Sequence, residues 1–461
     1  MRGPIYLTAD IRRMEQAAGS APLMERAGAA AAGLAATLCT GKDVLVLAGP
    51  GNNGGDARIV AELLKQKFFR VTIAEKDLPA QKDWGLVIDG LFGIGLTRPI
   101  EGDYAKLVEY ANRQTCPVLA LDVPSGIQSD SGRVLGCAVR ATHTITFIAL
   151  KPGLLTLDGP DHCGALTVND LGLELQRLLV PSAWVAEPGL FRGVLKPRPR
   201  NFHKGMAGSL AVVGGAAGMT GAALLAGRAA LKLGAGRVYV GLLEENAPAV
   251  DLLAPELMLR HPDDVFGEDL DVMVVGPGLG RGERAETLVG AALASDIPCV
   301  IDADALNLLS QNEMLRKACV HRSAETLITP HPAEAARLLG CPVGTVQEDR
   351  VRAARMLAEN LNAHTVLKGN GSVLVARDGH WFINTSGNPG MASAGMGDVL
   401  AGMLGALLAQ RYSGETALAL GVHLHGSAAD ALAREGAGPV GLTAGELIDA
   451  SRRIWNAWLK D

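Results

Sequence analysis

Short apolar runs alternate with helix-length segments along the first third of the chain, and this alternation limits the fold more than any other feature. The runs lie at 43–49, 70–75, 85–90, 117–122 and 142–150. An alanine-rich segment at 20–38 and a second segment near 56–67 have the length and periodicity of helices. Such alternation predicts parallel strands in one doubly wound sheet, with helices on both faces.

The same rhythm restarts after residue 200. Its runs lie at 209–215, 237–243, 272–278, 299–306, 326–334 and 365–372. We therefore expect a second α/β sheet. Near its edge, SVLVAR and HWFIN flank the pair Asp378-Gly379, which favours a hairpin with a tight two-residue connection. From Asp398 onward the sequence predicts mainly helices.

The two series are separated by an irregular stretch at 181–200 that contains four prolines. A chain of 461 residues is also longer than one hydrophobic core usually serves. We therefore predict an α/β chain with a Rossmann-like three-layer αβα domain over 1–190, a linker over 191–200 and a second αβα domain over 201–461.

Charge and composition exclude several classes of partner. A formal net charge of -5 offers no basic field for nucleic acid and no polybasic membrane anchor. The most apolar window, 210–227, is interrupted by glycines and Thr220, and no signal pattern opens the chain. The seven cysteines show no CxxC spacing, which indicates reduced thiols. We expect a cytoplasmic protein that acts on small molecules, without nucleic-acid or membrane partners.

Polar residues end three of the front strands. One strand runs into GPGNNGGDA at 49–57, another ends at Asp89 and a third at Asp122. Ligands of parallel sheets bind beyond the carboxyl ends of the strands. Glycines there let backbone amides approach an anion, and oxygens of Asn53, Asp89 and Ser125 are suited to a cation beside it. Each residue alone is equally typical of an ordinary turn.

The segment GPGNNG also matches the dinucleotide fingerprint GxGxxG, with Glu75 near the expected offset. A Rossmann dehydrogenase is therefore an alternative. Asp56 argues against it, because an acid at the start of the following helix would repel the pyrophosphate that the fingerprint holds.

The motifs NNGGDA, IDGLFGIGLTRPIEGD and LDVPSGI, together with LMERAG at 23–28, closely resemble the YjeF N-terminal family, the epimerases of hydrated NADH and NADPH (NADHX and NADPHX). The resemblance implies that Asp122 is catalytic and touches the nicotinamide, and that Asn53, Asp89 and Ser125 coordinate potassium. It implies substrate phosphate contacts from Asn52, Asn53, Gly54, Gly55, Asp56, Gly93, Ile94, Gly95, Leu96, Thr97, Arg98 and Pro99. Ala57 departs from the family, which usually has glycine there.

In the rear half, a glycine-rich turn from Gly390 to Gly397 leads into Asp398 and a long apolar run. Free amides at a helix start form an anion site suited to a transferring phosphoryl group. Asp398 is placed to take a proton from an attacking hydroxyl. The equally open alternative is an N-cap aspartate that only satisfies helix amides.

The motifs DADALN at 302–307, TPHPAE at 329–334, KGNGS at 368–372 and GMGD occur in the order seen in ribokinase-like enzymes. HKG at 203–205, the glycine-rich segment 214–236 and GPGLG at 276–280 look like the NAD(P)H-hydrate dehydratase family, over residues 200–455. This resemblance implies a nucleotide site of Lys368, Gly369, Asn370, Gly371, Ser372 and Gly397. It implies substrate contacts from Ala222, Gly278, His331 and Asp398, which is also the catalytic residue. Asp302 and Asp304 stay unassigned.

Together the resemblances imply a metabolite-repair enzyme that epimerises R- and S-NAD(P)HX and dehydrates the S epimer. The dehydratase family is understood to phosphorylate the hydroxyl and then eliminate phosphate. ADP is the expected co-substrate, giving AMP and phosphate, although the motifs leave ATP open. The resemblance also implies potassium in the epimerase, Mg²⁺ in the dehydratase and a homo-oligomer, by family a tetramer. The alternatives are a ribokinase-like kinase of a vitamin precursor with a nucleotide-binding front module, and a front module that only binds.

Overall fold

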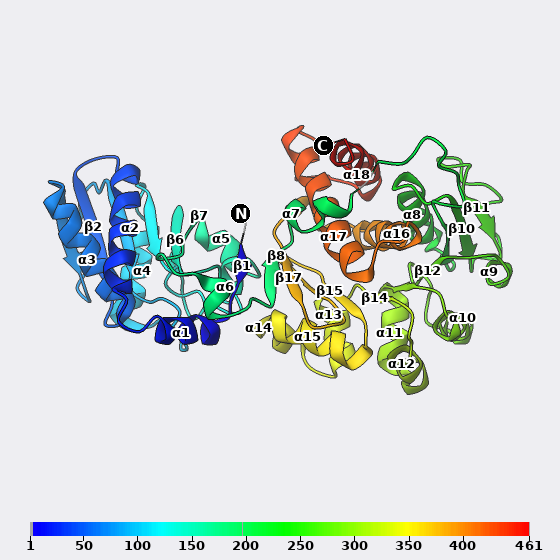
Figure 1. Cartoon of the computed structure of the whole chain (residues 1–461), viewed down its shortest axis with the longest axis horizontal. Coiled ribbons are helices and arrows are strands. Elements are labelled where there is room, and N and C mark those ends of the chain that lie inside the picture. Colours follow the sequence, from blue (N-terminus) through cyan, green and yellow to red (C-terminus); the bar gives the residue numbers. More distant parts are fainter. Residues whose placement is uncertain (1–2, 196, 461) are drawn as a thin grey trace. The chain divides into compact units, whose positions relative to one another are not determined.

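The computed structural model describes residues 3–195 and 197–460. The chain forms two compact units, one over Gly3–Trp184 and one over Val185–Asp461. Each unit is an α/β structure around a mainly parallel sheet (Figure 1), so the predicted fold class is confirmed.

The first unit contains a six-stranded sheet in which every neighbouring pair is parallel. Its strand order is β3 (Arg70–Ala74), β2 (Asp43–Ala48), β4 (Leu86–Gly90), β5 (Val118–Leu121), β6 (His143–Phe147) and β7 (Ala165–Asn169). Five of these strands lie where the apolar runs predict them. A short strand β1 (Pro4–Ile5) pairs antiparallel with β8 (Ala183–Val185).

Helices cover both faces of this sheet. The helices are α1 (Thr8–Ala17), α2 (Leu23–Leu38), α3 (Asn52–Gln66), α4 (Gly102–Asn112), α5 (Gly159–Cys163) and α6 (Leu175–Leu178), with a 3-10 turn η1 (Pro152–Leu154). Successive residues of β2 point to opposite faces. Val44 and Val46 pack in a core with α2 and α3, whereas Leu45 and Leu47 pack in a second core with α4. The first unit is therefore the predicted three-layer sandwich.

The sheet of the second unit is parallel from β11 to β15 and antiparallel at β16 and β17. Its order is β17 (Trp381–Asn384), β16 (Ser372–Val375), β15 (His364–Leu367), β14 (Thr326–Ile328), β13 (Cys299–Ile301), β12 (Val272–Val275), β9 (Ser209–Gly214), β10 (Arg237–Leu242) and β11 (Met258–Arg260). Strands β9, β10, β12, β13, β14 and β15 follow the second series of apolar runs, as predicted, whereas β11 was not predicted.

Helix α16 (Met396–Ala409) is almost entirely buried and packs against α8 (Thr220–Lys232). A Cβ at Gly402 would lie 2.0 Å from the Ala226 carbonyl oxygen, so only glycine permits this close packing. The other helices of this unit are α7 (Pro188–Phe191), α9 (Pro262–Val265), α10 (Glu283–Ala294), α11 (Ala303–Gln311), α12 (Glu313–Val320), α13 (Pro332–Leu339), α14 (Val343–Glu348), α15 (Arg350–Leu361), α17 (Gly414–Arg434) and α18 (Ala444–Trp458), with 3-10 turns η2 (Arg192–Val194) and η3 (Pro389–Met391).

The predicted hairpin is confirmed by the antiparallel pairing of β16 with β17. The prediction that two residues connect these strands is wrong. The Gly379 amide donates to the Ala376 carbonyl (2.9 Å) and the Ala376 amide donates to the His380 carbonyl (2.7 Å), which leaves residues 377–379 in the connection. Gly379 has φ +93°, in the left-handed region. In a three-residue connection, a turn followed by such a glycine matches the twist of the two strands. A two-residue connection would need a type I′ or II′ turn to match it.

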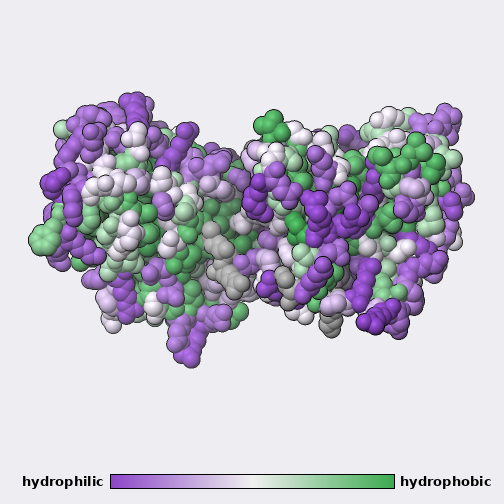
Figure 2. All heavy atoms as spheres, turned by 90° about the horizontal axis from the view of Figure 1, so that it is seen from above, coloured by the Kyte–Doolittle hydropathy of each residue, from purple (hydrophilic) through white to green (hydrophobic). Residues whose placement is uncertain are grey.

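In the view of Figure 2, hydrophilic residues cover much of the visible face of each unit, interrupted by smaller apolar areas. Within residues 3–195 and 197–460, none of the helices is long and apolar enough to cross a bilayer.

The second unit begins at Val185, a few residues before the expected boundary at 190. In the stretch expected as a linker, Phe191 is 2% exposed, and its ring centroid lies 5.8 Å from those of His423 and Trp458. Residues just before 192 therefore contribute to the core of the second unit. That the two domains fold separately stays a prediction.

We expect Phe191→Ala to destabilise the second unit by about 3 kcal/mol, because truncating a buried phenylalanine removes apolar contacts and leaves a cavity. The neighbouring Leu190 is 42% exposed, so Leu190→Ala is a matched control that changes stability by less than about 0.5 kcal/mol. Guanidinium unfolding of the full chain, followed by tryptophan fluorescence, measures both. Equal midpoints for the two variants would contradict the assignment of Phe191 to this core.

Candidate active sites

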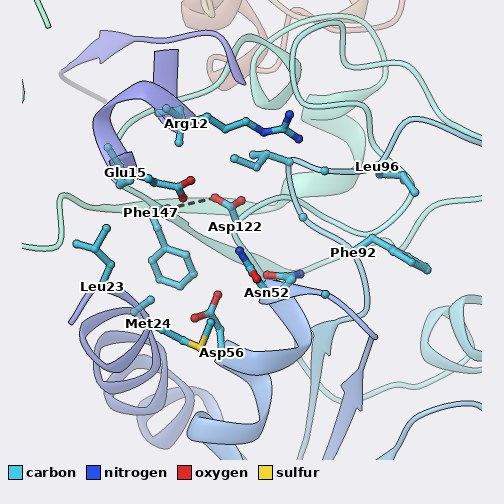
Figure 3. A pocket seen from close by; sticks show the side chains of 18 of the residues that line it. Arg12, Glu15, Leu23, Met24, Asn52, Asp56, Phe92, Leu96, Asp122 and Phe147 are labelled. Atoms are coloured by element: carbon cyan, nitrogen blue, oxygen red, sulfur yellow. Dashed lines mark hydrogen bonds between the residues drawn. The ribbon is translucent and has the colours of Figure 1, made fainter. Parts of the chain in front are cut away.

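A cavity of about 500 Å³ opens in the first unit beside the carboxyl ends of β2, β4 and β5 (Figure 3). The predicted residues that line it are Asn52, Asn53, Asp56, Gly93, Ile94, Gly95, Leu96 and Asp122. Helices α1 and α2 add further lining residues, among them Arg12, Glu15 and Met24. The strand-end argument therefore identified the right edge of the sheet. Gly54, Gly55 and Thr97 lie next to lining residues in the chain, and Arg98 and Pro99 follow Thr97, but none of these five lines the cavity itself.

Asp89 and Ser125 are buried together and contact Leu91 and Phe92, which line the cavity. The Ser125 amide donates to Asp89 Oδ2 (2.8 Å), and the Ser125 hydroxyl donates to Asp89 Oδ1 (2.6 Å). Burial raises the pKa of Asp89 to about 6, although these two donors and the Leu91 amide lower it. The structure therefore brings these two predicted residues together, and their coordination of potassium stays a prediction.

Asn53 packs over the loop that follows Asp89. A Cβ at Gly93 would lie 3.3 Å from Asn53 Cγ, and one at Gly90 would lie 3.0 Å from the Asn53 carbonyl oxygen. The Asn53 side chain is buried, and neither its oxygen nor its nitrogen has a hydrogen-bond partner among the described residues. A buried amide without partners costs free energy, so this arrangement indicates that a ligand completes the site.

Asp122 follows β5 in a left-handed conformation with φ +64°, which costs energy in a residue other than glycine and is typical of functional sites. Its Oδ1 accepts from Lys151 Nζ (2.5 Å) and, at 3.5 Å, from the Phe147 amide. Its Oδ2 would lie 3.2 Å from a Cβ at Gly93, so this second oxygen faces the loop that lines the cavity.

Lys151 was not identified from the sequence. Its side chain is fully buried, and its ammonium donates to Asp122 Oδ1, Thr146 Oγ1 (2.8 Å) and the Phe147 carbonyl (2.7 Å). A lysine is buried only when it is paired and hydrogen-bonded. The available signal was its position directly after the last apolar run of the front series, since the same strand-end argument applies there.

Two further carboxyl groups face this cavity. Burial raises the pKa of Asp56 to about 7, and the charges of Asp122 and Glu15 raise it further. Burial also raises the pKa of Glu15, again with a contribution from Asp122. Figure 3 shows Glu15, Asp56 and Asp122 from three different elements around one space. Glu15 lies on α1, outside the quoted motifs, which is why sequence reasoning missed it.

In the second unit, Asp398 lies in the first turn of α16, and Gly395, with φ +86°, is the N-cap residue. The N-cap alternative for Asp398 is therefore wrong. Burial raises the pKa of Asp398 to about 6, with a contribution from Asp302, while Lys368 lowers it. A Cβ at Gly397 would lie 3.2 Å from Lys368 Nζ, so glycine leaves the helix start open toward this ammonium.

Asp302, left unassigned above, is 1% exposed and belongs to this cluster. Lys368 Nζ lies 3.1 Å from its Oδ1, which also accepts from the Thr329 hydroxyl (2.6 Å). Burial lowers the pKa of Lys368, but the charges of Asp302 and Glu334 outweigh burial and raise it. Asp304 instead accepts from the Gly280 amide and Arg281 Nε, both at 3.0 Å, and anchors the loop after Gly278.

The segment Lys368–Ser372 forms a tight loop after β15. The Ser372 hydroxyl donates to the Gly369 carbonyl (3.0 Å), and Gly369 and Gly371 have φ +146° and +61°. The buried Arg350, which the sequence did not single out, donates to the carbonyls of Leu367 (3.2 Å) and Lys368 (3.3 Å). The loop therefore has a fixed backbone.

His331 caps α13. Its Nδ1 accepts from the Ala333 amide (3.1 Å), and its own amide donates to Glu334 Oε2 (2.8 Å). Burial raises the pKa of Glu334 to about 7. His331 thus has the structural hydrogen bonds expected of a capping residue, and its substrate contact stays a prediction.

Ala222, in the first turn of α8, and Gly278, in the loop after β12, lie together. A Cβ at Gly278 would be 3.1 Å from that of Ala222, and the Ala216 amide donates to the Gly278 carbonyl (2.7 Å). The structure therefore joins the two glycine-rich segments that the sequence assigned to one substrate site.

Comparisons with known proteins agree with both units. Residues 20–84 and 70–153 match the family model described as YjeF-related protein N-terminus, and residues 210–453 match the model described as NAD(P)H-hydrate dehydratase. A solved structure of the ADP/ATP-dependent NAD(P)H-hydrate dehydratase from Bacillus subtilis, co-crystallised with ATP and Mg²⁺, is 30% identical with a TM-score of 0.54 and covers 59% of this chain and 98% of its own.

Two curated relatives match nearly the whole chain. The bifunctional NAD(P)H-hydrate repair enzyme of Coxiella burnetii is 37% identical over 98% of this chain and 99% of its own length. Its counterpart in Escherichia coli is 38% identical over 99% of this chain and 95% of its own length. With both family models matched in order along one chain, this protein belongs to the family of bifunctional NAD(P)H-hydrate repair enzymes.

Proposed function

We propose that the first unit interconverts R- and S-NAD(P)HX and that the second unit dehydrates the S epimer to NAD(P)H at the expense of ADP, giving AMP and phosphate. One observation carries the proposal: a chain of this family holds two separate clusters of ionisable groups, each at the carboxyl edge of its own sheet. A stereospecific dehydratase acts on one epimer only, and an epimerase in the same chain converts the other epimer into that substrate.

In the first unit, the substrate's phosphates lie against the NNGGD loop of 52–56 and the segment 93–99. The reacting nicotinamide ring lies at Asp122, whose Oδ2 is turned toward the cavity while Oδ1 is held by Lys151. Because Lys151 holds Oδ1, the Oδ2 atom of Asp122 serves as a base toward the ring's hydroxyl or an incoming water.

Potassium is held by Asn53, Asp89 and Ser125 in this proposal. The unpartnered amide of Asn53 supports a cation there, because its oxygen needs a donor or a metal. Two neutral ligands and one carboxylate suit a monovalent ion better than Mg²⁺, which demands a tight octahedron and more charge. The ion supplies positive charge close to the substrate's phosphates.

We expect R-epimer conversion to fall at least tenfold when potassium is replaced by tetramethylammonium at equal ionic strength, because the organic cation is too large for this site. Asp89→Asn should lower conversion similarly in potassium. Dehydration of S-NADHX by the second unit, measured in the same two salts, is the internal control. Equal R-epimer rates in both salts and in the variant would show that these residues only shape the loop.

Asp122→Asn and Lys151→Met should each lower R-epimer conversion about 100-fold or more, since one removes the base and the other leaves it unpaired. The S epimer should still be dehydrated at the normal rate, because neither residue belongs to the second unit. Chromatography of the epimers without ADP measures conversion, and recovery of absorbance with ADP measures dehydration. A Lys151→Met variant with normal epimer conversion would contradict the role of the ion pair.

In the second unit, Asp398 accepts the proton of the substrate hydroxyl as that hydroxyl attacks the phosphoryl group of the nucleotide. The amides at the start of α16 and the Lys368 ammonium neutralise the developing charge. Lys368, Gly369, Asn370, Gly371, Ser372 and Gly397 hold the nucleotide in this proposal. Ala222, Gly278 and His331 hold the substrate.

Mg²⁺ fits the same cluster. Asp302, Glu334 and Asp398 surround one lysine, so carboxylates exceed ammonium groups, and hard oxygen ligands of this kind suit a divalent ion that accompanies nucleotide phosphates. When bound, the ion offsets the charge of the phosphates during transfer.

Asp398→Asn should abolish dehydration and leave epimer conversion intact, because only phosphoryl transfer uses this carboxylate. In the wild type the base form exists above its raised pKa of about 6, so dehydration should decline as the pH falls through about 6. Initial rates of absorbance recovery between pH 5 and pH 8 test this. Near-normal dehydration by Asp398→Asn would remove the residue from the mechanism.

One experiment tests the whole proposal: the purified chain is incubated with mixed NADHX epimers and either ADP or ATP, and dihydronicotinamide absorbance is followed. Complete recovery supports both activities, and the preferred nucleotide identifies the donor. The alternative, a ribokinase-like kinase of a vitamin precursor, predicts that a phosphorylated product accumulates and that absorbance does not recover. We further propose a cytoplasmic homotetramer without nucleic-acid or membrane partners.

A further inference from the structure

The chemistry of hydrated NADH requires an acid as well as a base in the epimerase site. Water adds to an enamine-type double bond so that the hydroxyl is attached to the carbon beside the ring nitrogen, because the nitrogen lone pair stabilises positive charge there. Inverting this carbon by losing and regaining water breaks one C–O bond and forms another on the opposite face. The departing hydroxyl must gain a proton, and the attacking water must lose one.

Few groups in the cavity can supply that proton. Lys151 is fully buried, and all three of its protons are used in hydrogen bonds. Arg12 stays protonated at any pH at which the enzyme works. Asp56 lies on α3, within the NNGGD segment assigned to the substrate's phosphates. Glu15 remains, on the opposite wall formed by α1.

The position of Glu15 is fixed by the rest of α1. Ile11 and Met14 are buried in the main core of the unit, and the Thr8 amide and hydroxyl both donate to Asp130 Oδ1, at 2.7 and 2.9 Å. The helix therefore holds the Glu15 side chain toward the cavity. In Figure 3 its carboxyl group lies close to that of Asp122, and the two groups interact electrostatically.

We propose that Glu15 is the general acid of the epimerase site, paired with Asp122 as the general base. The proposal rests on the epimerase function proposed above. It also rests on the unpartnered, buried side chain of Asn53 in the same cavity, which indicates that a ligand fills this space beside the two carboxyl groups.

The charges around Glu15 suit an acid. Asp122 and Asp56 face it as carboxyl groups, whereas Lys151 and Arg12 face it as cations. Burial, followed by the charge of Asp122, raises the pKa of Glu15, so its proton is kept to higher pH than in a free glutamate. Lys151 Nζ donates to Asp122 Oδ1, so this cation lies against Asp122. Environments that separate two carboxyl groups in this way assign them as acid and base.

The step balances. Glu15 gives its proton to the substrate hydroxyl, the C–O bond breaks, and water leaves as the ring nitrogen's lone pair forms a C=N bond. A water molecule then attacks the opposite face, its oxygen forms the new C–O bond, the C=N electron pair returns to nitrogen, and Asp122 takes the proton. Exchange with solvent returns the proton to Glu15 before the next turnover. Each inversion therefore replaces one substrate oxygen by one from water.

The test uses the full-length enzyme in potassium, without ADP, and follows the equilibration of R- and S-NADHX by chromatography. Glu15→Gln removes the proton and keeps the shape of the side chain. We expect kcat for inversion to fall about 100-fold or more, while KM changes less than about threefold. In the wild type the rate should fall on the alkaline side as Glu15 loses its proton, and this limb should be absent from the residual activity of Glu15→Gln.

Two controls separate chemistry from folding. Gln16 is the next residue of α1, is exposed and does not line the cavity, so Gln16→Ala should behave as wild type. Dehydration of S-NADHX with ADP should be normal in both variants. In H₂¹⁸O, the wild type should incorporate one labelled oxygen per inversion.

Inversion by Glu15→Gln within threefold of the wild-type kcat would overturn the proposal, and so would a loss confined to KM, which marks binding alone. Inversion without ¹⁸O incorporation would overturn the step in which water leaves and returns. If the wild type itself fails to equilibrate the epimers, the epimerase function falls and the role of Glu15 falls with it. An active Glu15→Gln variant overturns only the latter.

Discussion

Each unit of this chain places a lysine against an aspartate at the carboxyl edge of its sheet: the fully buried Lys151 against Asp122 in the first, and the partly buried Lys368 against Asp302 in the second. An ammonium group removed from water is costly unless its charge and hydrogen bonds are satisfied. Thr146 and the Phe147 carbonyl satisfy Lys151, and Thr329 supports Asp302. The strands that end at each pair must therefore keep their pairing register with neighbouring strands. The same register places the other site residues at this edge of the sheet.

The pairs also explain why neighbouring carboxyl groups differ. In the first unit, Lys151 donates to Asp122, and burial raises the pKa of Asp56 and of Glu15, although Lys151 and Arg12 lower the pKa of Glu15. In the second unit, Lys368 is closest to Asp302, while burial raises the pKa of Asp398 and Glu334. In each unit a lysine thus lies against one carboxylate while burial raises the pKa of neighbouring carboxyl groups, and such differences between neighbours serve acid–base chemistry near neutral pH.

Sequence reasoning was accurate where a local pattern sets the structure. Alternating apolar runs gave both sheets, and strand-end motifs located Asp89 with Ser125 and Asp398 in its helix turn. It failed where a single residue acts through tertiary contacts. Glu15 reaches its cavity only because α1 packs across the sheet, and the unassigned Asp302 becomes a site residue only through Lys368, which follows it by 66 positions. The hairpin connection has three residues and not the two that were predicted, because a turn followed by a left-handed glycine matches the strand twist as well as a type I′ or II′ turn does.

The two chemistries place opposite demands on their sites, and the units differ accordingly. Inverting a hydroxyl-bearing carbon needs water on both faces of the ring, and the first unit provides a cavity of about 500 Å³ whose wall carries carboxyl groups on α1, on α3 and after β5. Phosphoryl transfer instead needs fixed donors around one developing charge. The second unit supplies them from a glycine-capped helix start, with Gly397 leaving no Cβ between the helix amides and Lys368. Because a side chain at position 397 would fill that space, the glycine is as necessary to the site as the charged residues that it exposes.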